Sequence, residues 1–166
     1  LAGLSSAQIR SLNSTQIGAL STAQFSAFGT AQVAALTTAQ FGGLTTAALN
    51  SLDSTAFAAL TSAQIKSLTS DQVANLESAD VAALTTAQIR SLSSTNLNAL
   101  TSTNIAALSS AQIGAFTSAQ MAGLTTAAIA AIESADLAGL TSAQIRSLSS
   151  TQIGALSTAQ FSAFGT

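Results

Sequence analysis

The sequence predicts an all-α solenoid built from very short helices, with one octapeptide per step. Every eighth residue from Leu4 to Phe164 is Leu, Phe or Ile, without a gap in 21 successive octads. A second apolar residue follows five positions after each of these, from Ile9 to Phe161. Hydroxyl residues also recur in every octad, where a helix could begin. We therefore expect one small unit stacked many times around a shared apolar core.

The composition excludes several classes of protein. The chain has 166 residues, of which 48% are hydrophobic and 6% charged, with a net charge of −2 and no His, Cys, Trp, Tyr or Pro. Four basic residues are too few to follow a nucleic-acid backbone, so nucleic acid is not an expected partner. Without Cys there is no disulfide and no thiolate metal site. The longest apolar stretch, 127–132, is too short to span a membrane.

Each octad, numbered from its large residue, has a regular order of side chains. Position 2 is usually Ser, Thr, Asn, Asp or Gly, with Glu77 and Glu133 as exceptions, and position 3 is always Ser or Thr. Position 4 is mostly Ala or Thr, and position 5 is mostly Gln. Position 6 is apolar, position 7 is variable, and position 8 is small apart from Asn75. Small residues at position 8 would let neighbouring coils approach closely.

One continuous helix does not fit this period. At about 100° per residue, eight residues rotate the chain by about 800°, which is a drift of about 80° per octad. The large residues would circle such a helix, and eight also differs from the heptad of a coiled coil. The helix must therefore be interrupted once per octad.

The octad 84–91 contains the signals for this interruption. With Thr85 as N-cap, Gln88 occupies N3 and completes a capping box, while Leu84 and Ile89 form a hydrophobic staple. Each octad is then a corner followed by one to two helical turns. An alternative N-cap is the hydroxyl at position 3, which shifts each helix by one residue.

The alternative fold is a β-solenoid with positions 1, 3, 6 and 8 facing inward. Ser and Thr suit strands, but Ala and Gln dominate where β-branched and aromatic residues would be expected. Only three Val occur, at positions 33, 73 and 81. All seven Phe and Met121 fall at position 1 or 6, which indicates core packing rather than an aromatic ligand site.

A longer period is present as well. Residues 1–30 and 137–166 differ only at Ser5 against Thr141 and Asn13 against Ser149, at an offset of 136 residues or 17 octads. Because 17 is divisible by neither two nor three, all octads should be near-equivalent steps along a screw. We expect residues 1–166 to be a single continuous array, and a fragment of a longer chain with a 136-residue repeat.

No catalytic, cofactor-binding or metal-binding residue is predicted. The many hydroxyls have no His or Cys beside them to act as a base, so we do not expect an enzyme. Two E-S-A-D octads carry the carboxylate pairs Glu77/Asp80 and Glu133/Asp136. Calcium needs six to eight oxygen ligands, which such a pair does not supply. The preferred interpretation is a surface charge cluster with the Arg that follows ten residues after each Asp; acids in a first helical turn also suit the helix dipole.

The octads LTTAQIRS, LTTAQFGG, LTSAQIRS and LSSAQIGA resemble the L-T-T-A-Q-[IV]-x-A repeats of very long bacterial secreted or surface proteins. Those proteins are described as adhesin-like or as haem utilisation/adhesion proteins, and the resemblance covers essentially the whole chain. It implies an extracellular, extended, structural role. Haem binding is not expected, because the chain lacks His, Cys and Tyr and only Met121 could ligate iron.

The expected function is that of an elongated stalk, fibre or filament, secreted or on the cell surface, that contacts a host or neighbouring cell. The weakly charged surface and the absence of a polar terminal repeat predict lateral or end-to-end self-association. The alternative is an adhesive or ligand-binding surface, including ice binding through ranks of Ser and Thr.

Overall fold

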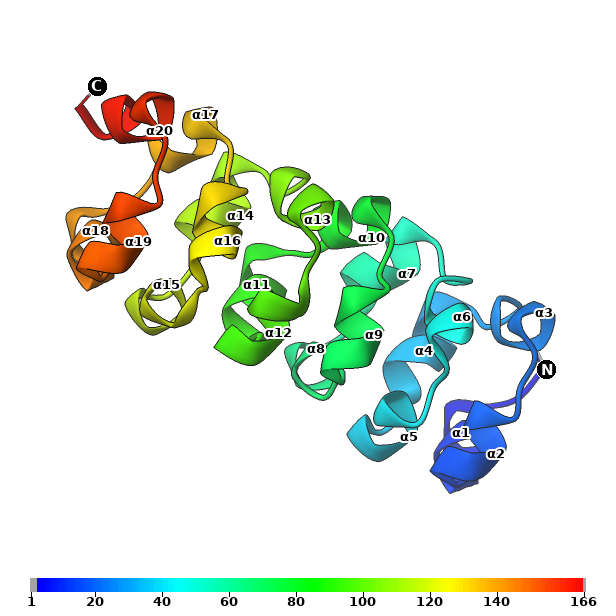
Figure 1. Cartoon of the computed structure of the whole chain (residues 1–166). Coiled ribbons are helices and arrows are strands. Elements are labelled where there is room, and N and C mark those ends of the chain that lie inside the picture. The colour runs from blue at the N-terminus through cyan, green and yellow to red at the C-terminus, as the bar shows by residue number, and fades with distance from the viewer. Residues whose placement is uncertain (1–2, 166) are drawn as a thin grey trace.

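The computed structural model describes residues 3–165, and this part of the chain is a solenoid of helices with four to six residues each (Figure 1). Helix follows helix once per octad, as the sequence predicts. None of these residues lies in a β-strand, so the β-solenoid alternative is wrong. No helix in the described range is long and apolar enough to cross a membrane.

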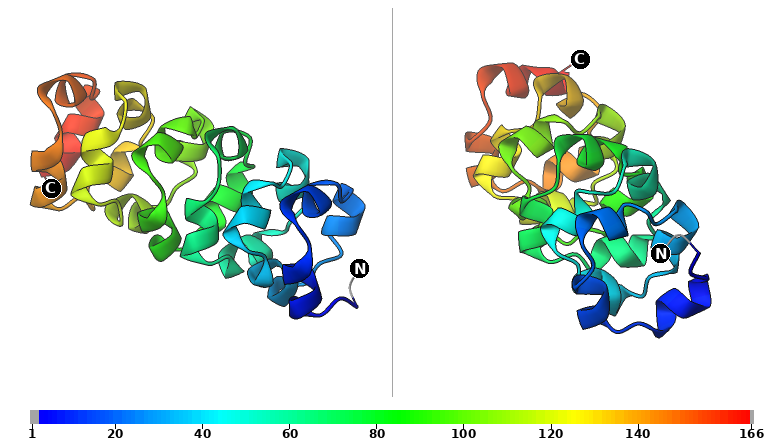
Figure 2. Two further views of the ribbon diagram at one scale, coloured as in Figure 1. Left: turned by 90° about the horizontal axis from the view of Figure 1, so that it is seen from below. Right: turned by 90° about the vertical axis from the view of Figure 1, so that its right-hand side faces the viewer.

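Three octads make one coil. Each helix packs against the third helix after it, as in the pairs α1–α4, α2–α5 and α9–α12, so that residues 24 positions apart stack on each other. The helices consequently form three columns along the solenoid. Figures 1 and 2 show the coils stacked along one direction, with the two ends of the chain at opposite ends of the molecule.

The first column contains α1 (Ser6–Ser11), α4 (Thr30–Ala35), α7 (Ser54–Ala59), α10 (Ser78–Ala83), α13 (Ser102–Ala106), α16 (Thr126–Ala130) and α19 (Ser150–Gly154). The second contains α2 (Ser14–Gly18), α5 (Thr38–Gly42), α8 (Ser62–Lys66), α11 (Thr86–Ser91), α14 (Ser110–Gly114), α17 (Ser134–Leu137) and α20 (Thr158–Ser162). The third contains α3 (Thr22–Phe25), α6 (Thr46–Leu49), α9 (Ser70–Ala74), α12 (Ser94–Ala99), α15 (Ser118–Gly123) and α18 (Ser142–Ser147). A short 3-10 helix, η1 (Ala163–Gly165), follows α20.

Position 2, not position 3, is the N-cap. In α11, the Thr85 side chain accepts a hydrogen bond from the backbone N–H of Gln88, and Gln88 Oε1 accepts one from the N–H of Thr85 at 2.6 Å. Leu92, at position 1 of the next octad, ends the helix with an extended backbone (φ −64°, ψ 140°). We call this extended position 1 residue a corner. The predicted capping box and corner are confirmed.

The core is the predicted double row of apolar residues. Position 6 side chains such as Ile89 and Ile113 are 0% exposed, and position 1 side chains such as Leu84 and Leu92 are 4% exposed. Burial of each such side chain contributes about 1.5–3 kcal/mol. The prediction that every Phe packs in the core is wrong at one place: Phe161 is 59% exposed in the last coil, where no further coil covers it.

The two copies of the repeated segment occupy different columns. Because 17 octads are not a whole number of three-octad coils, Arg10 in α1 belongs to the first column and its counterpart Arg146 in α18 to the third. Both helices nevertheless have the same capping box and the same length. The octads are therefore near-equivalent steps, and the repeated segment need not return to the same side of the molecule.

Candidate functional site: the amide ladder between coils

The Gln at position 5 joins two coils through its side-chain amide. In α15, Gln120 Oε1 accepts from the N–H of Thr117 at 2.8 Å, which completes the capping box of its own helix. Its Nε2 donates to the carbonyls of Ile89 at 2.9 Å and Leu92 at 2.7 Å, in the coil below. Gln120 is 5% exposed. One amide thus caps the start of one helix and the end of another 31 residues earlier.

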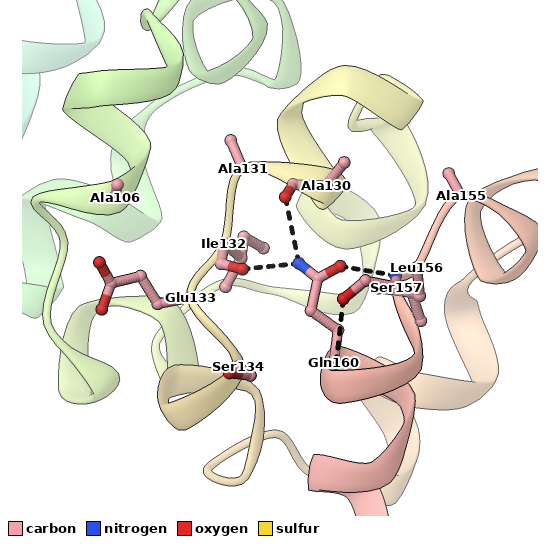
Figure 3. Close-up of a pocket in the computed structure, with 10 residues that line it drawn as sticks. All are labelled: Ala106, Ala130, Ala131, Ile132, Glu133, Ser134, Ala155, Leu156, Ser157 and Gln160. Carbon is pink, nitrogen blue, oxygen red and sulfur yellow. Dashed lines mark hydrogen bonds between the residues drawn. The ribbon is translucent and has the colours of Figure 1, made fainter.

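This arrangement repeats along the solenoid, and we call each such Gln, with its bonds, a rung of the amide ladder. The acceptors are the corner carbonyl 28 residues earlier and carbonyls 30 or 31 residues earlier. Figure 3 shows the rung of Gln160, whose Nε2 lies between the carbonyls of Ala130 and Ile132 while its Oε1 faces Ser157. The Gln rungs are Gln32, Gln40, Gln64, Gln72, Gln88, Gln112, Gln120, Gln144, Gln152 and Gln160.

Some octads carry a shorter side chain at position 5. Asn96 and Asn104 still reach the corner below, with Nδ2 donating to the carbonyls of Leu68 at 2.9 Å and Leu76 at 3.0 Å. Gln8, Gln16 and Gln24 of the first coil make no rung. In the later coils the remaining position 5 residues have no amide, and they are Ala48, Ala56, Ala128, Asp80 and Asp136. These last residues interrupt the ladder, because neither a methyl group nor a carboxylate can donate a hydrogen bond.

Among the residues that interrupt the ladder, Asp80 has the fewest hydrogen bonds to replace those of a rung. Its side chain is 4% exposed, and Oδ2 is buried without a hydrogen-bond partner. The N-cap of its helix is Glu77, which makes no side-chain capping bond. Burial raises the pKa of Asp80, and the nearby carboxylates of Glu77 and Asp53 add to the effect, so that together they bring this pKa to about 6.

Asp136 occupies the equivalent place in the second E-S-A-D octad. It is 8% exposed, and its Oδ1 accepts a hydrogen bond from Ser110 Oγ at 2.5 Å. Both Asp residues lie in a first helical turn, where the dipole suits an acid. They are buried between coils, however, so the predicted surface charge cluster is wrong.

The arginines make a different contact from the predicted one. Arg90 Nε donates to the carbonyl of Ala115, 25 residues later in the coil above, at 3.1 Å. Arg10, Asn50 and Asn98 make the same kind of bond, to Ala35, Asn75 and Gly123 respectively. These four position 7 side chains therefore link successive coils on the outside of the solenoid. The variable position is partly structural.

The hydroxyls at position 2 and Met121 have structural roles. Position 2 hydroxyls accept from the third backbone N–H of their helices, as Thr141 does from Gln144. Met121 is 0% exposed in the core. A groove beside the Gln160 rung is lined mainly by small residues, with Glu133 as its one ionisable side chain (Figure 3). Among the described residues, no three His, Cys, Asp or Glu side chains group closely enough to hold a metal ion.

The ladder was not predicted from the sequence, although a signal for it is present. Glu is the more favourable N3 residue for the helix dipole and completes a capping box equally well. No octad of this chain has Glu at position 5, whereas Gln occurs there repeatedly. An amide both accepts and donates, whereas a Glu carboxylate only accepts, so the use of Gln in place of Glu indicates a second partner for the side chain.

Three-helix coils, a continuous core and an amide ladder define the class of this protein: a tandem-repeat solenoid of short helices. The family model of the ALTTAQ repeat matches over residues 1–30, 17–46, 38–70, 73–110, 97–126 and 129–166. The chain belongs to the ALTTAQ repeat family. No match is found among curated proteins or among solved structures.

The structure gives a role to several positions of the family motif. In A-L-T-T-A-Q at 83–88, the first Ala is the small position 8, Leu84 is the corner, and Thr85 is the N-cap. Gln88 is the rung, bonded to the carbonyls of Phe57 and Leu60. The motif therefore spans the junction between two helices. An adhesin context for the repeat stays a prediction.

Proposed function

We propose that this chain is a structural, non-enzymatic module of an elongated bacterial stalk, fibre or filament, extracellular or on the cell surface, which self-associates. The observation that carries the proposal is the continuity of the core and the amide ladder along the described part of the chain. Such a form is typical of repeat proteins that span distance.

The two end coils are complementary to each other. In the first coil, Gln8, Gln16 and Gln24 are exposed, and their Nε2 groups have no acceptor among the described residues. In the last coil, no side chain of the described residues donates to the corner carbonyls of Leu148 or Leu156. Most of the position 1 residues of both end coils are only partly buried, and Phe161 in the last coil is exposed, whereas the position 6 residues of the first coil are fully buried. A second copy stacked head to tail would continue both rows, as would a further coil of a longer parent chain.

The test is assembly of the purified chain, followed by sedimentation equilibrium and electron microscopy. We expect linear particles whose mean mass rises with protein concentration. Phe161→Asp should raise the concentration needed for assembly by about tenfold or more, because it places a charge in an apolar contact. Ala82→Asp is the matched control, since it adds the same charge at an exposed site on the side of α10.

The outcomes separate the alternatives. If only Ala82→Asp weakens assembly, the contact is lateral rather than end to end. A wild-type chain that stays monomeric at about millimolar concentration would overturn self-association. Labelling of intact cells with an impermeant reagent tests the location, and protection of the chain until lysis would contradict an extracellular position.

The adhesive or ligand-binding alternative needs outward residues chosen for a partner. At position 2, helix capping explains the choice of Ser and Thr without any ligand. A scramble of position 7 separates the two functions only if Arg10, Asn50, Arg90 and Asn98 are kept, because they hold coils together.

A further inference from the structure

The carboxyl group of Asp80 lies at a place where the ladder requires a hydrogen-bond donor. Its register is that of a rung: the corner 28 residues earlier is Leu52, the acceptor position that every Gln and Asn rung uses. Asp has the same shape as Asn, and Asn96 and Asn104 both reach their corners. An ionised Asp80 would place a carboxylate oxygen against a carbonyl oxygen, and neither can donate.

The surroundings of Asp80 do not favour a negative charge. The side chain is 4% exposed, and its Oδ2 has no partner. From α7, which packs against α10, the carboxylate of Asp53 faces it, and Glu77 adds a second negative charge from the N-cap of its own helix. Helix α13, on the other side of α10, carries no ionisable side chain. No cation compensates the site among these elements.

We propose that Asp80 is a proton-operated joint of the solenoid: its protonated carboxyl donates to the carbonyl of Leu52 and closes a rung, and its ionised form opens that rung. The reaction is loss of the carboxyl proton to solvent; no other covalent bond is made or broken, and the hydrogen bond to the carbonyl of Leu52 is lost with the proton. The consequence is local. The junction between α6 and α7 is held in mildly acidic surroundings and loosened at neutral pH.

The sign follows from the pKa of Asp80, which is raised from 3.8 to about 6 in the folded chain. The folded state then binds the proton more tightly than the unfolded state. The contribution to stability is therefore complete below about pH 4 and is lost as pH rises through about 6. Each pKa unit is a tenfold change in the folding equilibrium, so the two-unit shift corresponds to about a hundredfold.

Asp136 supplies the matched control. It has the same octad sequence and the same burial class, but Ser110 Oγ donates to it. Asp53 lies 27 residues before Asp80. The residue 27 positions before Asp136 is the uncharged Ser109. An Asp→Asn change at either site replaces a titratable carboxyl group by an amide of the same shape. Only the change at Asp80 should remove a pH-dependent joint.

The direct experiment is an NMR titration of the Asp80 side-chain carboxyl carbon in the wild-type chain, with a chelator present to exclude metal binding. We expect a midpoint near 6, together with faster amide hydrogen exchange at residues 49–53 above that pH. Urea unfolding from about pH 4 to pH 8 should show a decrease in the folding equilibrium of wild type relative to Asp80→Asn, tenfold to a hundredfold in all. Asp136→Asn should keep the wild-type decrease.

A midpoint below about 4.5, or unchanged exchange at residues 49–53 across the titration, would overturn the joint. So would pH profiles of wild type and Asp80→Asn that run parallel. The proposed role of Asp80 depends only on the amide ladder within one chain. These measurements therefore test it even if the chain does not assemble into fibres.

Discussion

At the scale of single residues, the solenoid depends on a side chain with two hydrogen-bonding functions. A Gln rung forms hydrogen bonds with an N–H group at the start of one helix and with carbonyls at the end of another. These terminal groups have no partner within their own helix, and they make up a larger fraction of the backbone in a short helix than in a long one. With helices of four to six residues, nearly every backbone group is near an end. The amide therefore replaces intrahelical bonds that such helices are too short to make.

Replacing Gln120 by Glu tests the donor half of a rung. The acceptor oxygen is kept, but the bonds to Ile89 and Leu92 are lost and a charge is placed in a site that is 5% exposed. We expect a loss of about 3 kcal/mol in the free energy of unfolding, measured by urea titration at neutral pH. Gln24→Glu is the control, because Gln24 is exposed and caps only its own helix. Equal losses at both sites would show that the ladder adds nothing to the capping box.

Gly123, at position 8, lies where the coil below approaches most closely. A Cβ on Gly123 would collide with the Oγ and Cβ of Ser94 in the coil below, whereas a Cβ on Gly154, at position 7 of its octad, would meet nothing within 4 Å. Each is the last residue of its helix, and neither has a positive φ. Gly123→Val should cost about 1–3 kcal/mol by overpacking. Gly154→Val should change thermal stability by less than about 0.5 kcal/mol, and a comparable loss there would rule out coil contact as the cause.

At the scale of the element, one octad is a helix and its corner, and the two E-S-A-D octads are its weakest versions. Glu77 and Glu133 make no capping bond, and the Asp at position 5 makes no rung. The chain nevertheless keeps a helix at both places, because the position 1 and position 6 side chains are still buried. Packing therefore maintains the element where local signals are poor.

Restoring those signals should stabilise the element. Glu133→Thr combined with Asp136→Gln supplies an N-cap hydroxyl and a donor toward the corner of Leu108, in place of the bond from Ser110. We expect a gain of about 1–3 kcal/mol, detected as a higher midpoint of thermal unfolding. The two single substitutions should add up to less than the double one, since the capping box needs both side chains. A double variant no more stable than wild type would contradict this assignment of the rung.

The element was largely predictable from the sequence, while the contact between elements was not. The period of eight, the Ser/Thr–x–x–Gln pattern and the apolar pair at positions 1 and 6 are local signals, and they correctly predicted the corner, the N-cap and the core. The acceptors of Gln120 lie 28 and 31 residues away, a separation set by the number of octads per coil. That number depends on the angle at the corner, which residue types alone do not determine. For the same reason, Asp80 was expected at the surface and is buried instead.

At the scale of the whole molecule, the coil has three octads but the long repeat has 17, so the two periods do not coincide. The repeated segment begins in the first column at α1 and in the third at α18. If the parent chain repeats the 136-residue block, as the sequence predicts, identical side chains return to the same column only after three blocks. A surface property of the block would then be distributed around all three sides of a fibre.

Because the octads are equivalent, the chain should still fold after deletion of one complete octad, a change that would unfold an ordinary globular domain. Removing residues 108–115, one complete octad, places Gln120 over the corner of Leu84 instead of Leu92, and Leu84 is the same type of acceptor. Every later helix moves to the neighbouring column. Each corner, core residue and rung then contacts a residue of the same octad position as before. Far-UV circular dichroism should show the same helical content per residue, with a thermal midpoint lowered by only a few degrees. Removing residues 108–111, half an octad, should lower it far more, because polar positions would then enter the core at about 1.5–3 kcal/mol for each large side chain displaced. If the two deletions are equally damaging, the columns are not interchangeable and the octad is not the structural step.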